Sequence, residues 1–197
     1  MSTFSVCRLV RILLLALTMA AGPAYGEGAS FAWFEASGPE TDVEDIRGLA
    51  EAQWQSVARK QTLNFGFTKS TYWLRVEVPA EPVNRVLEIG YPLLDDVRVY
   101  WYSGGEQVER HVTGDSRKFG SRPIYHRNFV FPVPSNSDPT TAYVRVQSEG
   151  AVQIPAQVIE SADFLAREQL DYGWQAVFLG IMIAMALYNL FVFVIVR

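Results

Sequence analysis

The chain has 197 residues, of which 49% are hydrophobic and 13% aromatic, and its formal net charge at pH 7 is -4. This composition excludes a disordered chain, and because contacts to nucleic-acid phosphates need clustered cations, it argues against a nucleic-acid partner. The single cysteine, Cys7, excludes an intrachain disulfide and a zinc site built from several thiolates.

The N-terminal segment has the pattern of a secretory signal peptide. Two arginines precede an apolar run at residues 12–21, and Ala24 and Gly26 place small residues where a signal peptidase requires them. The run is about ten residues long, which is shorter than the roughly 20 that a spanning helix needs. We therefore predict a signal peptide over residues 1–26 and export of the part that follows.

The exported part has the pattern of an all-β domain. Short alternating runs rich in Val, Tyr, Trp and Phe recur between turn residues, and residues 103–106 (Ser-Gly-Gly-Glu) are typical of a hairpin turn. The predicted strands are Ser30–Ala36, Thr71–Val78, Arg85–Tyr91, Asp96–Tyr102, Gln107–Thr113, Ile124–Phe131, Ala142–Gln147 and Gln153–Ile159. These strands suffice for two sheets, so we predict a mainly β fold, a β-sandwich over residues 27–160.

Two helical segments accompany the strands. Residues 41–44 have the spacing of a capping box, and Val43, Ile46 and Leu49 recur at helical period. We expect this short helix to pack over one end of the sandwich. A helical connector at residues 161–173 is predicted to run directly into the C-terminal apolar segment, which would make the connection stiff.

Residues 174–196 form an apolar segment that is long enough, as a helix, to cross a bilayer core of about 30 Å. Trp174 at its start and Arg197 after its end fit the aromatic belt and the positive-inside rule, so the N-terminus is expected outside. Gln175 and Asn189 predict packing against other helices. We therefore expect the first transmembrane helix of a bundle that is truncated in this chain. The acidic exported domain is expected to be held at the membrane by this helix only.

Catalytic and metal-binding motifs are sparse. The sequence has no Gly-x-Ser-x-Gly elbow, and His111 and His126 have no metal-ligand spacing, so we predict a binding protein and no enzyme. Asp95, Asp96 and Asp115 are candidates for a calcium site, but they lack the twelve-residue calcium loop, and turn aspartates usually cap their own backbone. No cofactor is therefore predicted, with calcium as the alternative.

Alternation along three strands places arginines beside aromatic rings on one face of a sheet. The side chains expected in the core are Tyr72, Leu74, Val76, Val78, Val97, Val99, Trp101, Val144 and Val146. The opposite face then carries Trp73, Arg75, Arg98 and Arg145 with tyrosines between them. Rings that stack on sugars, beside arginines that bind hydroxyls or carboxylates, would form a recognition surface. Cross-strand packing with ion pairs such as Arg75 with Glu77 is the equal alternative.

Several separated motifs then occur in a familiar order. They are Asn64–Arg75, Leu87–Arg98, Thr113–Asp115, Arg122–Phe131 and Tyr143–Ser148. Over roughly residues 30–160 the chain resembles the second type of extracellular domain of bacterial seven-transmembrane receptors with diverse intracellular signalling modules, 7TMR-DISM. Residues 180–191 resemble the first helix of that family's membrane bundle.

The resemblance implies a jelly-roll sandwich similar to carbohydrate-binding modules, in the periplasm, ahead of seven helices in the bacterial inner membrane. It also implies a cytoplasmic output such as a histidine kinase or a diguanylate cyclase, which would lie beyond this chain. The positions that match the family motifs are the candidate ligand-binding residues. They are Trp73, Arg75, Asp96, Arg98, Asp115, Arg122, His126, Arg127 and Arg145.

Two functional hypotheses follow. In the first, the chain is the periplasmic ligand-sensing domain of a signal-transduction receptor, and it binds a carbohydrate or a small carboxylated ligand. In the alternative, it is a protein–protein interaction module that senses a partner receptor or self-associates without a small ligand. A groove over the arginine-bearing face would favour the first hypothesis, and a flat apolar patch would favour the second.

Overall fold

The computed structural model describes residues 28–36, 38, 41–58, 62–135 and 138–196, so the predicted signal peptide lies outside the described residues. The strands are β1 (Ser30–Ala36), β2 (Gln55–Ser56), β3 (Leu63–Phe67), β4 (Thr71–Val78), β5 (Arg85–Ile89), β6 (Asp96–Ser103), β7 (Glu106–Thr113), β8 (Phe129–Pro132), β9 (Thr140–Gln147), β10 (Ala151–Ile154) and β11 (Ala156–Glu160). The helices are α2 (Val43–Arg47), α3 (Ser161–Val196) and the two 3-10 turns η1 (Glu51–Gln53) and η2 (Phe119–Ser121).

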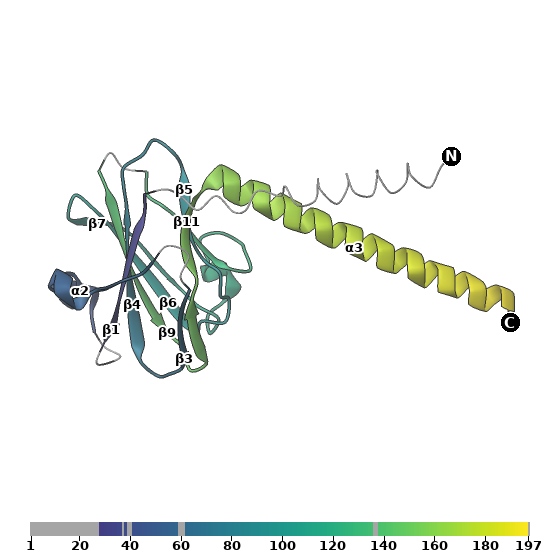
Figure 1. The fold of residues 1–197 in the computed structure, drawn as a ribbon, viewed down its shortest axis with the longest axis horizontal. Coiled ribbons are helices and arrows are strands. Elements are labelled where there is room, and N and C mark those ends of the chain that lie inside the picture. The colour runs from purple at the N-terminus through teal and green to yellow at the C-terminus, as the bar shows by residue number, and fades with distance from the viewer. Residues whose placement is uncertain (1–27, 37, 39–40, 59–61, 136–137, 197) are drawn as a thin grey trace, which may run out of the picture.

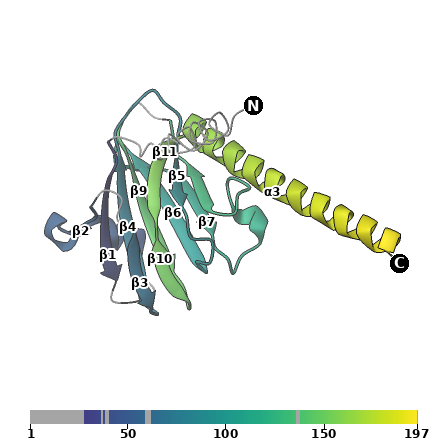
Figure 2. The same ribbon diagram turned by 45° about the vertical axis from the view of Figure 1, so that its right-hand side comes forward.

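The strands form two layers (Figure 1, Figure 2). One layer is a six-stranded antiparallel sheet in the order β2-β1-β4-β9-β6-β7. The other layer consists of a three-stranded sheet, β11-β5-β8, and a two-stranded sheet, β10-β3. The prediction of a mainly β fold is confirmed. The jelly-roll connectivity and the likeness to carbohydrate-binding modules stay predictions.

The core lies between the two layers, and strand alternation supplies it. Leu74, Val99 and Val144 of the large sheet point inward from β4, β6 and β9, and they pack against Ile89 and Phe131 of the facing layer. All nine side chains that the sequence assigned to the core belong to this cluster. Successive strand residues face opposite sides, so the inward row fixes the outward row as well.

Two predicted strands differ from the structure. Only β8 forms from the predicted strand at 124–131, because the preceding residues bend to place their carbonyl groups around the Arg122 side chain. The predicted strand at 153–159 is divided at Pro155, which has no N–H for a ladder, so β10 pairs with β3 while β11 pairs with β5. Strand β3 was missed because Gly66, at φ 66°, interrupts its pattern beside a register shift.

The short helix differs in both its cap and its place. Asp42, not Thr41, is the N-cap, and its carboxylate accepts a hydrogen bond of 2.7 Å from the Val43 N–H. The helix packs with Val43 and Ile46 against the outer face of the six-stranded sheet, not over an end of the sandwich. Figures 1 and 2 show α2 on the side of the sandwich away from α3.

Helix α3 continues the chain without a break from the last strand. The predicted connector and the predicted membrane segment form one helix of 36 residues, and Gly173 does not interrupt it. Within the described residues, α3 is the one helix that is long and apolar enough to cross a membrane. The sandwich and the candidate membrane span are therefore joined by a rigid element.

Candidate functional site

Eight of the nine predicted site residues fall into two groups. Five lie on the outer face of the six-stranded sheet: Trp73 and Arg75 on β4, Asp96 and Arg98 on β6, and Arg145 on β9. Another three, Arg122, His126 and Arg127, lie in the loop that leads to β8. His126 and Arg127 contact α3, whereas Arg122 donates to the carbonyl groups of His126 and Arg127. Asp115 lies in the turn after β7. Burial lowers the pKa of Arg122, and the charge of the nearby Asp115 opposes this effect to a smaller extent.

Trp73 and Arg75 are parts of the fold and are not open to a ligand. The Trp73 side chain is 0% exposed, and its ring stacks on Tyr100 at 6.0 Å beneath the residues of α2. The Arg75 guanidinium donates to both carboxylate oxygens of Glu51, at 2.7 and 2.5 Å, and lies 3.2 Å from Glu77. The ion pair of Arg75 with Glu77 that the sequence suggested is thus present.

Asp96 is the centre of an arginine cluster on the same sheet. Its Oδ2 accepts hydrogen bonds from Arg98 at 2.8 Å and from Arg145 at 2.7 Å, and its Oδ1 accepts one from Arg117 at 2.8 Å. Burial, followed by the repulsion of Arg98, lowers the pKa of Arg145. Against these three guanidinium groups stand the carboxylates of Asp96 and of the neighbouring Asp95, so the cluster carries one positive charge in excess, which favours an anion nearby.

A shallow hollow of about 460 Å³ lies beside this cluster. It is lined by Asp95, Asp96, Arg98, Ser116, Arg117 and Gln147. The Arg98 and Arg117 side chains are partly exposed there, whereas Arg145 is buried beneath them. Guanidinium groups bind carboxylates through paired N–H donors, so the hollow has the chemistry to accept a small anionic molecule.

The aspartates proposed for calcium have other partners. Asp95 accepts from the Glu149 N–H at 2.7 Å and from the Ser148 hydroxyl at 2.8 Å, and these bonds hold its pKa below the ordinary value. Asp96 is bound by arginines. Among the residues that the structure describes, no group of three or more His, Cys, Asp or Glu side chains is placed to hold a metal ion.

The turn after β7 fits closely against the segment that precedes β6. Gly114 has φ 148°, and a Cβ atom there would lie 1.9 Å from the Asp95 carbonyl oxygen. The neighbouring Asp115 N–H donates to the Leu94 carbonyl at 2.7 Å, which keeps the two segments together. Only glycine fits this position without moving the backbone beside the hollow.

Replacing Gly114 with alanine is expected to lower the free energy of unfolding by about 2 kcal/mol, because the added Cβ must displace the Asp95 backbone. Chemical unfolding of the full chain in detergent, followed by tryptophan fluorescence, measures this loss. Gly150→Ala is the control, since its Cβ would meet only the Ser148 hydroxyl at 3.7 Å, and it should change stability much less. Equal stability of the two variants would contradict the close fit.

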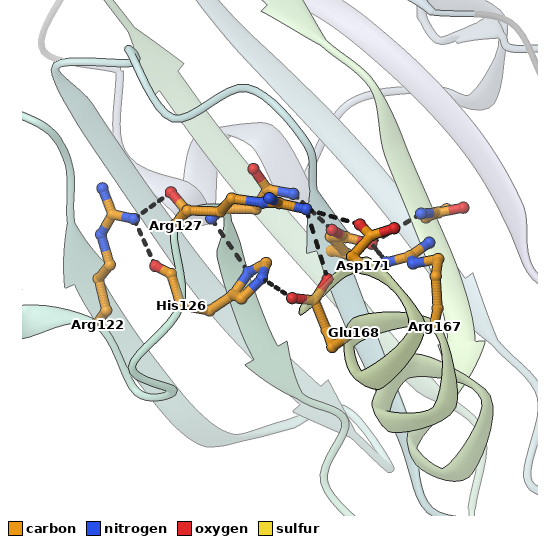
Figure 3. Close-up of polar contacts among 9 residues, drawn as sticks. Arg122, His126, Arg127, Arg167, Glu168 and Asp171 are labelled. Atoms are coloured by element: carbon orange, nitrogen blue, oxygen red, sulfur yellow. Dashed lines mark hydrogen bonds and ion pairs between the residues drawn. The ribbon is translucent and has the colours of Figure 1, made fainter. Parts of the chain in front are cut away.

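The second group of residues joins the sandwich to α3 (Figure 3). The His126 Nε2 lies 2.9 Å from Glu168 of α3, and Arg127 donates to Asp171 at 3.0 Å. The Asn128 N–H donates to His126 Nδ1 at 3.1 Å, which leaves the ring proton of a neutral histidine on Nε2, facing Glu168. We call the polar contacts between α3 and the sandwich the helix junction.

Glu88 on β5 is the buried centre of the helix junction. Its side chain is 3% exposed, and it forms an ion pair with Arg167 of α3. Asn128 and Gln157 donate to its two oxygens at 2.7 and 2.8 Å. Burial raises the pKa of Glu88, but the hydrogen bonds from Asn128, Arg167 and Gln157 outweigh it and hold the pKa below 4.5. The carboxylate is therefore ionised inside the junction.

Sequence reasoning found His126 and Arg127 but missed their partners. Arg167, Glu168 and Asp171 follow Phe164 at three-, four- and seven-residue spacing, which places all of them on one face of α3. Phe164 is buried against Val86, Val130 and Ile159 of the sandwich and gives the junction an apolar base. The spacing of these residues was a signal for a charged helix face. Its use would have required matching that face with the buried charge of Glu88 on β5.

A comparison with protein-family models identifies the domain. The model described as 7TMR-DISM extracellular 2 matches residues 28–160, which cover both layers of the sandwich and end where α3 begins. No curated protein matches the sequence at a significant level. The matched residues make up more than half of the chain and precede the candidate membrane helix. The chain therefore belongs to the 7TMR-DISM extracellular 2 family, a family of extracellular sensor domains and not of enzymes.

Proposed function

We propose that the chain is the periplasmic ligand-sensing part of a signal-transduction receptor in the bacterial inner membrane. A signal peptide over residues 1–26 directs export, and residues 27–160 sense the ligand. Residues 161–173 connect this domain to residues 174–196, which form the first helix of a membrane bundle. The output is a cytoplasmic module beyond this chain. One observation carries the proposal: α3 is bound to the sandwich and continues without a break into the candidate membrane span.

The helix junction supports signalling through α3. A ligand that favours one arrangement of the sandwich can change a helix only if the two move together. Arg167 and Glu168 of α3 are bonded to buried groups of the sandwich, Glu88 and His126. A shift of β5 or of the loop before β8 would therefore be passed to α3 directly.

The ligand that fits best is a small carboxylated molecule. The hollow offers the partly exposed guanidinium groups of Arg98 and Arg117 beside a cluster with unbalanced positive charge. A neutral carbohydrate would need exposed rings for stacking, but Trp73, Tyr100 and Tyr102 on this face are buried. The small carboxylated ligand is thus favoured over a neutral glycan, and a uronic acid combines both chemistries.

The alternative hypothesis, a protein–protein interaction module, is less well supported by the outer face of the six-stranded sheet. That hypothesis relied on an apolar patch on the outer face of the six-stranded sheet. The apolar side chains of this face, including Trp73 and Tyr102, pack against Ile46 of α2 and against Trp54. An intermolecular contact with these rings would need α2 to move away first.

Ligand-induced stabilisation of the full chain in detergent tests the proposal, because any molecule that binds the native state raises the unfolding temperature by mass action. Citrate, succinate, galacturonate, glucose and calcium chloride are the probes. We expect a dose-dependent rise with a carboxylate, lost in Arg117→Ala and kept in Arg110→Ala, whose exposed arginine lies on β7 outside the hollow. No response to any carboxylate, in a protein that unfolds cooperatively, would favour the interaction module.

A further inference from the structure

The loop between β7 and β8, residues 115–128, exposes two aromatic rings. Tyr125 is 78% exposed and Phe119 is 50% exposed. The rings contact each other edge to face, with centroids 5.6 Å apart. Large side chains that are this exposed on one loop mark a contact surface more often than isolated exposed residues do.

The same loop contacts α3 just before the start of the candidate membrane span. Arg127, two residues after Tyr125, donates to Asp171 at 3.0 Å (Figure 3). Asp171 precedes Trp174, the first residue of the predicted span, by three residues, which is about 4.5 Å along a helix. The polar interface of a bilayer is about 5–8 Å thick on each side, so a bilayer around residues 174–196 would place Arg127 at headgroup depth.

The aromatic residues of α3 lie at the same level. Tyr172 and Trp174 are exposed on the helix, where tyrosine and tryptophan side chains prefer the membrane interface. The contact of Arg127 with Asp171 brings the loop that carries Tyr125 toward the level of these two rings.

The charge of the loop also differs from that of the whole chain. The chain carries more acidic than basic side chains, but within this loop Arg117, Lys118, Arg122 and Arg127 outnumber the single acidic residue, Asp115. Arg117 and Arg127 are paired with Asp96 and Asp171, and Arg122 is buried, so Lys118 is the cation that this loop offers to lipid. Lys118 is exposed beside Phe119. Cations near a bilayer surface are attracted to anionic lipid headgroups by about 1 kcal/mol each.

We propose that the 115–128 loop docks on the lipid surface, with Phe119 and Tyr125 in the interfacial region and Lys118 toward the lipid phosphates. The sandwich then has two attachments to the membrane, α3 and this loop, where the sequence had suggested the helix alone. Two attachments fix the orientation of the sandwich relative to the bilayer. Phe119, Tyr125 and Lys118 do not line the hollow, although Ser116 and Arg117 at the start of the same loop do, so docking can be tested without changing a residue of the hollow.

Site-directed spin labelling of the full chain tests this proposal. A cysteine introduced at Gly120, in a Cys7→Ser background, carries a nitroxide next to Phe119. Its Cβ would lie 3.5 Å from the Tyr125 hydroxyl, which is an ordinary van der Waals contact, so both rings can stay in place. The protein is placed in nanodiscs of phosphatidylethanolamine and phosphatidylglycerol, and collisions with oxygen and with a water-soluble nickel chelate are compared. We expect the ratio of oxygen to nickel accessibility to be at least about twofold higher than for a label at Asp45 on α2, because oxygen concentrates in lipid.

A ring-deficient protein provides the decisive comparison. In Phe119→Ser with Tyr125→Ser, the accessibility ratio at Gly120 should fall to the Asp45 value, and an unchanged spectrum at Asp45 would show that the fold persists. An accessibility ratio at Gly120 equal to that at Asp45 with both rings present would overturn the proposal. Loss of access to both oxygen and nickel would also overturn it, because a protein partner would then cover the loop.

Discussion

Replacing Glu88 with alanine is expected to lower the free energy of unfolding by about 3 kcal/mol, within the range for breaking a buried ion pair. The change leaves Asn128 and Gln157 without their acceptor and Arg167 without its counter-charge. Arg167 is partly exposed and can turn toward water, so the loss falls at the lower end of that range. Urea unfolding of the full chain in detergent, followed by tryptophan fluorescence, measures it.

Glu81→Ala is the matched control for this variant. Glu81 also pairs with an arginine, Arg85 at 3.4 Å, but the Glu81 side chain is 43% exposed, and the buried Arg85 also donates to the Pro79 carbonyl at 2.6 Å. A pair with one exposed partner contributes little, and Arg85 keeps this second acceptor, so the Glu81→Ala variant should lose about 1 kcal/mol or less. Equal losses in Glu81→Ala and Glu88→Ala would contradict the central place of Glu88 in the helix junction.

The Glu88 carboxylate also predicts a specific response to acid. Burial opposes its ionisation, but hydrogen bonds from Asn128, Arg167 and Gln157 outweigh burial and lower its pKa from 4.5. Because the folded pKa lies below the unfolded one, the contribution of Glu88 is complete above about pH 4.5 and is lost as the pH falls through the folded value. Glu88→Gln should therefore lose less stability than the parent as the pH falls below about 4.5. Identical acid sensitivity would mean that Glu88 is not ionised in the fold.

The sandwich could be predicted because the side chains of its large sheet alternate regularly between the core and the outer face. In β4, β6 and β9 every second residue is apolar and points between the layers, so alternation alone identified the core side chains. The second layer was harder, because its strands are short and its central strand, β5, is buried on both sides. All five residues of β5 are buried, including the charged Arg85 and Glu88, so alternation there has no polar face to reveal.

The candidate site was only half predictable. The sequence placed Arg98 and Arg145 on one face, and the structure brings both to Asp96, two and forty-nine residues away in the chain. Their third companion, Arg117, comes from a turn whose path no periodicity describes. Trp73 was assigned to the correct face but to the wrong surroundings, because covering that face depends on a five-residue helix.

Trp73 is therefore the residue for which a role in the fold and a role in ligand binding predict the most different results. Trp73→Ala is expected to lower the free energy of unfolding by about 3–5 kcal/mol, because removing a fully buried tryptophan leaves a cavity under α2. Trp73→Phe should lose much less, since the indole N–H has no hydrogen-bond partner among the described residues and the smaller ring removes that buried donor. Urea unfolding of the full chain in detergent, followed by far-ultraviolet circular dichroism, measures both variants.

Ligand binding then separates a structural role from a contact role. The hollow beside Asp96 does not include Trp73, so any carboxylate that stabilises the parent should stabilise Trp73→Phe by the same temperature increment. A Trp73→Phe protein of nearly parental stability that has lost this increment would place the ring in the binding site and would require α2 to open. Because α2 is held by few residues, chiefly Val43 and Ile46, that outcome would identify it as a movable cover over the face.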